Sequence, residues 1–296
     1  MKDHLFVIVS VILLAIGFIL QKLYQKHAGQ ETIVGVTFSI YSACFSLVLL
    51  LAMNRFTPEF SWYSLINAAL RAACGLAYTV IGFRIMKYGN VALYMLFLMS
   101  GGMILPAVWG WLFLHEAVIP LRVLGVMIIF VSILITQLSK ERPNLKLLFF
   151  CLAVFVLNGF VSVLSKLHQI NTTYHTVSTE SYALIGTILS LGMSLILYAC
   201  LRKKKRGAQD ATPHRKRKLP VIQILIVAGY SILGCVSSLI QLRGAKFLPA
   251  SVLYPMITGG SIVFSGLFAL LFFGERPSKR EWLGIALCVC GTLLFL

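Results

Sequence analysis

The feature that most constrains this chain is a long apolar stretch that occurs twice, once in the first half and again near the end. In the second copy, about twenty apolar and small residues fill positions 254–273, and Gly274-Glu275-Arg276-Pro277 ends the run. A helix needs roughly this length to cross a hydrocarbon layer of about 30 Å. A shift of 159 residues places the first copy on the second, with identities at Arg84/Arg243, Lys87/Lys246, Gly101/Gly260, Phe113/Phe272, Glu116/Glu275, Leu124/Leu283 and Gly125/Gly284. Identities at charged and glycine positions in one ungapped register predict a duplicated membrane unit.

The composition predicts an integral membrane protein. Of the 296 residues, 59% are hydrophobic and 12% are charged, whereas a soluble domain is close to half apolar and a quarter charged. The formal charge of +17 would favour a nucleic-acid partner in a soluble protein. Here the basic residues lie between apolar runs, so we expect them to face the cytoplasm and anionic lipid, with no nucleic-acid partner.

Ten apolar runs of about twenty residues predict ten transmembrane helices. The runs cover about residues 5–24, 32–53, 63–86, 90–114, 119–138, 146–167, 177–201, 220–242, 248–273 and 280–296. Lipid permits only helices or a closed barrel, and continuous rather than alternating hydrophobicity excludes the barrel. The first run is followed by further spans and has no small-residue cleavage site, so we expect a helix and not a signal peptide. The links are short except for residues 202–218, which are expected to form a solvated basic loop without a fold of its own.

The first two helices of each half match in a second register, 144 residues apart. Lys22-Leu23-Tyr24-Gln25 aligns with Lys166-Leu167-His168-Gln169. The two offsets differ by 15 residues, nearly the length of the 202–218 loop, so the second half carries this loop as an insertion. An odd number of helices per half places the halves in opposite orientations. We therefore predict an all-α integral membrane fold with ten transmembrane helices in two inverted five-helix repeats, residues 1–144 and 145–296.

The duplicated unit resembles the EamA-type carriers of the drug/metabolite transporter superfamily over essentially the whole chain. The resemblance is carried by Phe113-Leu114-His115-Glu116 with Leu124-Gly125, and by the copy Phe272-Phe273-Gly274-Glu275 with Leu283-Gly284. His115 departs from the pattern, since the family usually has glycine before this glutamate. The resemblance implies a transporter of amino acids, other metabolites, drugs or lipid-linked sugars, and export rather than uptake.

Basic residues in the links predict the orientation in the membrane. The links fall into two alternating sets: nineteen of the 26 basic residues lie in the set that includes residues 202–218, and six lie in the set that includes the N-terminus. The positive-inside rule therefore predicts that the 202–218 loop faces the cytoplasm of a plasma membrane and that both termini lie outside. The family resemblance implies cytoplasmic termini, so the two arguments disagree.

The sequence offers no group of residues suited to catalysis. Histidines and carboxylates lie in links or at helix ends, and no Ser/His pair, paired carboxylates, metal-ligand spacing or phosphate loop falls at membrane depth. The seven cysteines lie in or beside apolar runs and are predicted to be small core residues. We therefore expect no enzyme activity, metal or cofactor. Only Glu180 approaches the membrane interior, so exchange or facilitated diffusion competes with proton antiport. Glu116 and Glu275 are predicted to end their helices and to pair with Arg122 or Arg280.

Arg71 is the most informative charged residue. It lies nine residues into the third span, about 13 Å from its start, where a charge is costly unless it faces protein or water. Its counterpart in the second half is Tyr230. Two roles remain open: binding an anionic group of the substrate, and a structural role through snorkelling or a helix–helix bond.

Other polar and aromatic residues at membrane depth or at helix ends are candidate substrate contacts around a mostly apolar cavity. With Arg71, the predicted substrate site comprises Lys22, Tyr78, Tyr94, Trp109, Asn158, Lys166, Tyr230, Gln241 and Tyr254. Aromatic and amide residues at such positions more often serve in packing or in the interfacial belt, and interfacial snorkelling is the alternative role of the two lysines.

The sequence therefore predicts a monomeric secondary transporter that moves a small organic metabolite by alternating access. The buried cation favours an amino-acid-like or other carboxylate-bearing solute. The alternatives are a lipid-linked sugar flippase of the same fold, a non-transporting membrane scaffold or sensor that uses residues 202–218, and, as the weakest, an intramembrane enzyme. The expected partners are a small-molecule substrate and the lipid bilayer.

Overall fold

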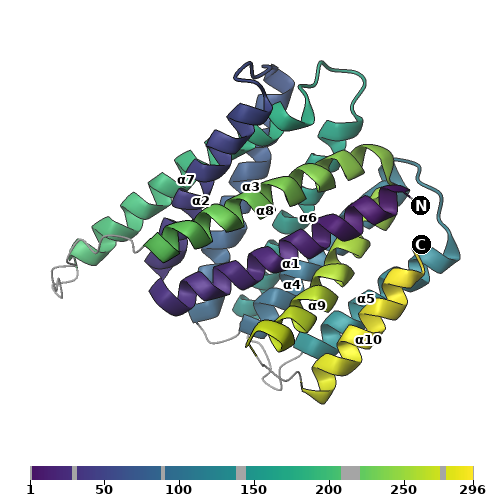
Figure 1. Cartoon of the computed structure of the whole chain (residues 1–296). Coiled ribbons are helices and arrows are strands. Elements are labelled where there is room, and N and C mark those ends of the chain that lie inside the picture. Colours follow the sequence, from purple (N-terminus) through teal and green to yellow (C-terminus); the bar gives the residue numbers. More distant parts are fainter. Residues whose placement is uncertain are drawn as a thin grey trace.

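Ten α-helices account for most of the chain, as predicted. The computed structural model describes residues 2–28, 32–87, 91–137, 145–207, 221–273 and 278–295, which form helices and short links without strands. The helices are α1 (Lys2–Ala28), α2 (Thr32–Met53), α3 (Trp62–Lys87), α4 (Val91–Phe113), α5 (Pro120–Gln137), α6 (Leu145–Ile170), α7 (Thr179–Gly207), α8 (Val221–Phe247), α9 (Ala250–Phe273) and α10 (Lys279–Leu293). Figure 1 shows them in one bundle, with both chain ends on the same side.

Eight of these helices are long and apolar enough to cross a membrane. The other two are α5, whose apolar part covers Pro120–Thr136, and α10, which has 15 residues. Both short helices are the fifth in their half of the chain, and they pack side by side (Figure 1).

The basic segment predicted as a loop begins as helix. α7 continues through Arg202 and Lys203 to Gly207, because lysine and arginine are good helix formers. The expectation that residues 202–218 lack structure is therefore wrong for residues 202–207. Residues 208–220, and the Gly274–Glu275 copy of the helix-end motif, lie outside the described part of the chain.

Helices of the first half pack mainly against helices of the second. α1 lies against α8 and α9, α2 against α7 and α8, α3 against α6 and α7, α4 against α6 and α9, and α5 against α10. If α1 is exchanged with α6, α2 with α7, and so on through α5 with α10, this set of packed helix pairs is converted into itself. For example, α1–α8 becomes α6–α3, and α1–α9 becomes α6–α4.

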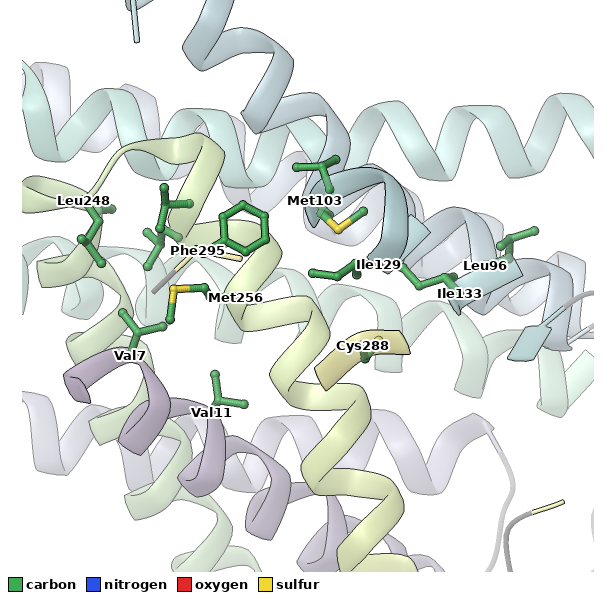
Figure 2. Packing of buried hydrophobic residues seen from close by; sticks show 14 residues of the cluster. Val7, Val11, Leu96, Met103, Ile129, Ile133, Leu248, Met256, Cys288 and Phe295 are labelled. Atoms are coloured by element: carbon green, nitrogen blue, oxygen red, sulfur yellow. The ribbon is translucent and has the colours of Figure 1, made fainter. Parts of the chain in front are cut away.

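The largest buried cluster joins α1, α4, α5, α9 and α10. Figure 2 shows Val11, Met103, Ile129, Met256 and Cys288 converging from these five helices. Lipid tails are as apolar as leucine, so close packing holds membrane helices together more than exclusion of water does.

Glycines permit the closest approaches, at equivalent places in the two halves. A Cβ at Gly101 in α4 would overlap the backbone of Phe155 in α6, and a Cβ at Gly260 in α9 would press on Val11 in α1. Gly101 and Gly260 are 159 residues apart, and Val11 and Phe155 are 144 residues apart. The contacts thus reproduce both sequence offsets.

The same exchange relates α5 and α10. Gly125 in α5 faces the ring of Phe295, and Gly284 in α10 faces the side chain of Thr136. Adding 159 to Gly125 and to Thr136 gives Gly284 and Phe295.

Glu116 lies after α4 and caps the start of α9. Its carboxylate accepts hydrogen bonds from the backbone N–H groups of Ala250 and Ser251 at 2.6 and 3.0 Å, and from Ser251 Oγ at 2.7 Å. An anion at a helix N-terminus satisfies free N–H groups and interacts favourably with the helix dipole. Glu116 therefore joins the two halves of the chain, and the expected pairing with Arg122 is replaced by this cap.

His115 has a φ of 53°. This left-handed region favours glycine because a Cβ is disfavoured there. The backbone therefore explains why the EamA-type pattern has glycine before the glutamate, and His115 adopts the same turn.

Candidate functional site

A cavity of about 360 Å³ lies between α1, α2, α3, α7 and α8. It falls within the size range of small-molecule sites. Its lining consists of Leu14, Gln21, Phe38, Ser39, Ser42, Ala43, Ser46, Leu50, Arg71, Ala183, Gly186, Thr187, Ser190, Tyr230, Ser231, Gly234, Cys235 and Ser238. Both halves of the chain contribute helices, so the cavity lies between them.

Arg71 is the charged residue in this lining. Its Nη1 atom is buried and has no hydrogen-bond partner, and its Cζ lies 5.6 Å from the centre of the Tyr182 ring. A buried guanidinium nitrogen without a hydrogen-bond partner is costly. The position therefore suits an anionic group that enters the cavity.

Tyr182 supports Arg71 from α7. Its hydroxyl donates a hydrogen bond to Asn67 Oδ1 at 2.8 Å, and its ring stacks on His168 with centroids 3.7 Å apart. Tyr182 is 0% exposed and His168 is 1% exposed. Because both rings are fixed by packing, the aromatic face that the guanidinium contacts is held in place, and Tyr182 is a positioning residue for Arg71.

Hydroxyl groups provide much of the polar surface of the cavity. They come from three helices and belong to Ser39, Ser42, Ser46, Thr187, Ser190, Ser231 and Ser238. A hydroxyl both donates and accepts hydrogen bonds, as sugar hydroxyls and phosphate oxygens require. The described lining contains Arg71 and no Asp or Glu, so the cavity favours a ligand that is anionic at one point and neutral elsewhere.

Tyr230 is the second predicted site residue that the structure brings into this lining. Its ring contacts Phe38 with centroids 4.7 Å apart, and its position is equivalent to Arg71 under the 159-residue offset. Lys22 is exposed and follows Gln21, which lines the cavity.

Three other predicted polar residues lie away from the cavity lining and bond to protein atoms. Asn158 Nδ2, Gln241 Nε2 and Tyr254 OH donate to Leu98 O, Ser237 Oγ and Ser162 O at 2.7, 3.0 and 2.6 Å. The Asn158 bond connects α6 to α4, and the Tyr254 bond connects α9 to α6. The Gln241 bond lies within α8 and orders the Gln241 side chain. Their roles in binding substrate stay predictions.

The three remaining aromatic candidates pack among other side chains. Tyr78 and Tyr94 belong to a cluster between α3, α4 and α6, and Tyr94 fills the space beside Gly82. Trp109 contacts Phe113 with ring centroids 4.3 Å apart, and its Nε1 is buried without a hydrogen-bond partner.

Lys166 belongs to α6, and its buried side chain reaches the C-terminal end of α8, away from the cavity lining. Its Nζ donates to the carbonyl oxygens of Ala245 and Leu248 at 2.8 and 2.6 Å. These are carbonyls that the end of a helix leaves unpaired, and a cation there also interacts favourably with the helix dipole. The contacts point to a structural role.

Lys166→Met is therefore expected to lower the free energy of unfolding by roughly 2–4 kcal/mol, because two buried carbonyls lose charge-assisted hydrogen bonds. Substrate affinity should stay within about twofold. Thermal unfolding in detergent and ligand titration measure the two effects. Unchanged stability with lost affinity would instead place Lys166 in the substrate site.

The structure brings together one Ser/His pair that the sequence did not predict. Ser64 Oγ lies 2.9 Å from His168 Nε2, and the Gln169 amide lies 3.3 Å from His168 Nδ1. Ser64 is fully buried, and its Oγ also accepts the backbone N–H of Val177 at 3.2 Å. A hydroxyl enclosed in this way ties α3 to α6 and offers no access for a substrate. No group of metal-ligating side chains occurs among the described residues.

Glu180, the carboxylate nearest membrane depth in the sequence, forms an ion pair with Arg243 at the end of α8. Its side chain is 19% exposed and that of Arg243 is 61% exposed. The ion pair joins the start of α7 to the last turns of α8.

The hydroxyl residues of the cavity and the aromatic residue that supports Arg71 were not predicted from the sequence. Ser39, Ser42 and Ser46 are spaced three and four residues apart and share a face of α2. That spacing was a usable signal, whereas the packing of Tyr182 against Arg71 depends on the approach of α3 and α7, which local sequence does not encode.

Comparisons with known proteins agree with this architecture. A model described as the EamA-like transporter family matches residues 144–296. The "Probable 4-amino-4-deoxy-L-arabinose-phosphoundecaprenol flippase subunit ArnE" of Yersinia pseudotuberculosis serotype O:1b (strain IP 31758) is 33% identical over 107 residues, which are 36% of this chain and 92% of that protein. The same subunit of Yersinia pestis (strain Pestoides F) matches with the same identity and coverage.

A protein crystal structure matches the fold over 99% of this chain and 96% of its own, with a TM-score of 0.72 and 14% sequence identity. At that identity the likeness concerns the fold alone. The family model covers more than half of the sequence. This multi-pass membrane protein belongs to the EamA-like transporter family.

Proposed function

We propose that this chain moves a lipid-linked sugar phosphate between the leaflets of a membrane, with the head group passing through the hydroxyl-lined cavity. The observation that carries the proposal is the buried, unpartnered Nη1 of Arg71 in a lining rich in hydroxyls. Guanidinium geometry matches phosphate oxygens, and the hydroxyls suit a sugar. The name of the matched relatives, a flippase subunit for a sugar phosphoundecaprenol, supports the same class of substrate.

The sugar is proposed to be neutral. The sugar in the name of the relatives carries an amino group, which is cationic at neutral pH and binds best beside a carboxylate. The described lining of this cavity has no Asp or Glu. A neutral sugar therefore fits the hydroxyls without a second cation near Arg71.

The two halves, residues 1–144 and 145–296, are proposed to be inverted repeats that rock about the cavity. The exchange of helix pairs and of the glycine contacts supports a two-fold relation between them. With five helices in each half, such an axis lies in the membrane plane, which is the arrangement of many alternating-access transporters.

A monomer in the plasma membrane is proposed as the working unit. The relatives are named as subunits, and 92% of one corresponds to 36% of this chain, whereas the present chain carries both halves. The basic end of α7, with Arg202 and Lys203, is proposed to face the cytoplasm.

A water-soluble carboxylate remains a second candidate substrate, because a guanidinium binds carboxylate as well as phosphate. Transbilayer movement in proteoliposomes separates the two. We expect a neutral sugar linked to polyprenyl phosphate in the inner leaflet to become accessible to an impermeant oxidant at least about tenfold faster than in protein-free vesicles, and faster than its amino-sugar analogue. Counterflow of labelled amino acids and organic acids, with no movement of the lipid, would contradict the proposal and favour metabolite transport.

A further inference from the structure

A second, apolar cavity lies along the seam between α2 and α8. It measures about 210 Å³ and is lined by Tyr41, Phe45, Gln223, Ile224 and Val227. Tyr41, Phe45 and Ile224 are 37%, 40% and 43% exposed, and both helices are candidate membrane spans. This apolar groove therefore opens on a surface that faces lipid.

The apolar groove and the hydroxyl-lined cavity are formed by the same two helices. Ser42 and Ser231 line the cavity, and each lies within one helical turn of a residue that lines the groove, Tyr41 and Val227 respectively. The two voids are thus neighbours across the seam. One is polar and carries a cation, and the other is apolar.

At this seam, a side-chain hydrogen bond connects α2 and α8, and its donor has a second acceptor within its own helix. Ser231 Oγ lies 3.1 Å from Ser42 Oγ, and it also has the carbonyl oxygen of Val227 at 2.7 Å. If α2 and α8 separate, the Ser231 hydroxyl keeps the acceptor within its own helix. Parting the helices here therefore leaves no buried donor on Ser231 without a partner.

We propose that the apolar groove binds the first isoprene units of the substrate's hydrocarbon tail while the phosphate contacts Arg71 and the sugar occupies the hydroxyl-lined cavity. The proposal rests on the proposed function. An amphiphile whose head enters a polar cavity must place its tail on apolar surface nearby, and the groove on the α2–α8 seam is such a surface. The charge of Arg71 selects an anionic lipid over a zwitterionic one.

Photolabelling of the full chain in proteoliposomes tests this assignment. The probe is a sugar-linked polyprenyl phosphate with a diazirine on its first isoprene units, and labelled sites are mapped by mass spectrometry. We expect labelling of Tyr41, Phe45 and Ile224. Phosphatidylcholine with a diazirine at a similar depth should label these residues at least tenfold less.

Two variants and a matched control test whether the labelling depends on Arg71 and on the apolar groove. Arg71→Gln removes the anion contact and Ile224→Trp fills the apolar groove, and each should lower labelling by the polyprenyl probe at least tenfold. Leu225→Trp adds the same ring on the next residue, which is 64% exposed and outside the groove lining, and should change labelling by less than twofold. Equal labelling by phosphatidylcholine, unaffected by Arg71→Gln, would identify ordinary surrounding lipid and overturn the proposal.

The readout separates this inference from the proposed function, because labelling measures binding and does not require movement across the bilayer. Selective labelling without transbilayer movement would support the tail site and contradict transport. Movement without labelling of the apolar groove would overturn the tail site and leave transport intact.

Discussion

Arg71→Met is expected to lower transport of the lipid-linked substrate by about 100-fold or more while leaving the melting temperature unchanged or raised. One or two charge-assisted hydrogen bonds to phosphate contribute roughly 1.5–3 kcal/mol each, and each 1.4 kcal/mol is about a tenfold change in affinity. Stability should not fall appreciably. The contact with the Tyr182 ring that is lost, worth about 0.5–1 kcal/mol, is offset because the buried Nη1 without a hydrogen-bond partner is removed as well, and methionine keeps most of the side-chain volume. Initial rates in proteoliposomes and thermal unfolding in detergent measure the two quantities.

Arg71→Lys is the matched control, since it keeps the charge and loses the planar fork. It should retain more transport than Arg71→Met. A large loss of stability in Arg71→Met with transport preserved per folded molecule would show that Arg71 is a structural residue.

Gly101→Ala is expected to destabilise the fold by about 3 kcal/mol or more. The added methyl group would overlap the backbone of Phe155, so α4 and α6 must separate, and overpacking against a backbone is not relieved by a rotamer change. Monodispersity on size-exclusion chromatography and the melting temperature should both fall.

Gly35→Ala, within α2, is the control because nothing lies within 4 Å of a Cβ at that position. It should be neutral or stabilising by up to about 1 kcal/mol, as alanine is the better helix former. Equal effects of the two substitutions would mean that the α4–α6 contact is not as close as described.

The fold was largely predictable because membrane helices must be long and continuously apolar. Each of the ten apolar runs corresponds to a helix, and the two sequence registers reappear in the contacts of Gly101 and Gly260. The helical start of the basic segment was missed because charge marks where a span leaves the lipid and not where the helix ends. The motif at His115 was interpretable only once its positive φ was known.

The site was less predictable. Arg71 stood out because an arginine at membrane depth has few structural explanations. Lys166 did not reveal that its charge caps α8, since a lysine at a helix end is equally suited to lipid, solvent or carbonyl groups. The cavity serines were overlooked because a helical serine can satisfy its hydroxyl on its own backbone, as Ser39 does with Gly35 O at 3.1 Å.

The equivalence of Arg71 and Tyr230 has an evolutionary consequence. In an assembly of two identical subunits every substitution arises on both sides of the axis, so a cation introduced into a central cavity faces its own copy. A tandem chain is free of that constraint, and here one position carries a guanidinium while its counterpart carries a phenol ring. Fusion thus allows the cavity walls to diverge, and a substrate can be selected for one binding orientation by mutations in a single half.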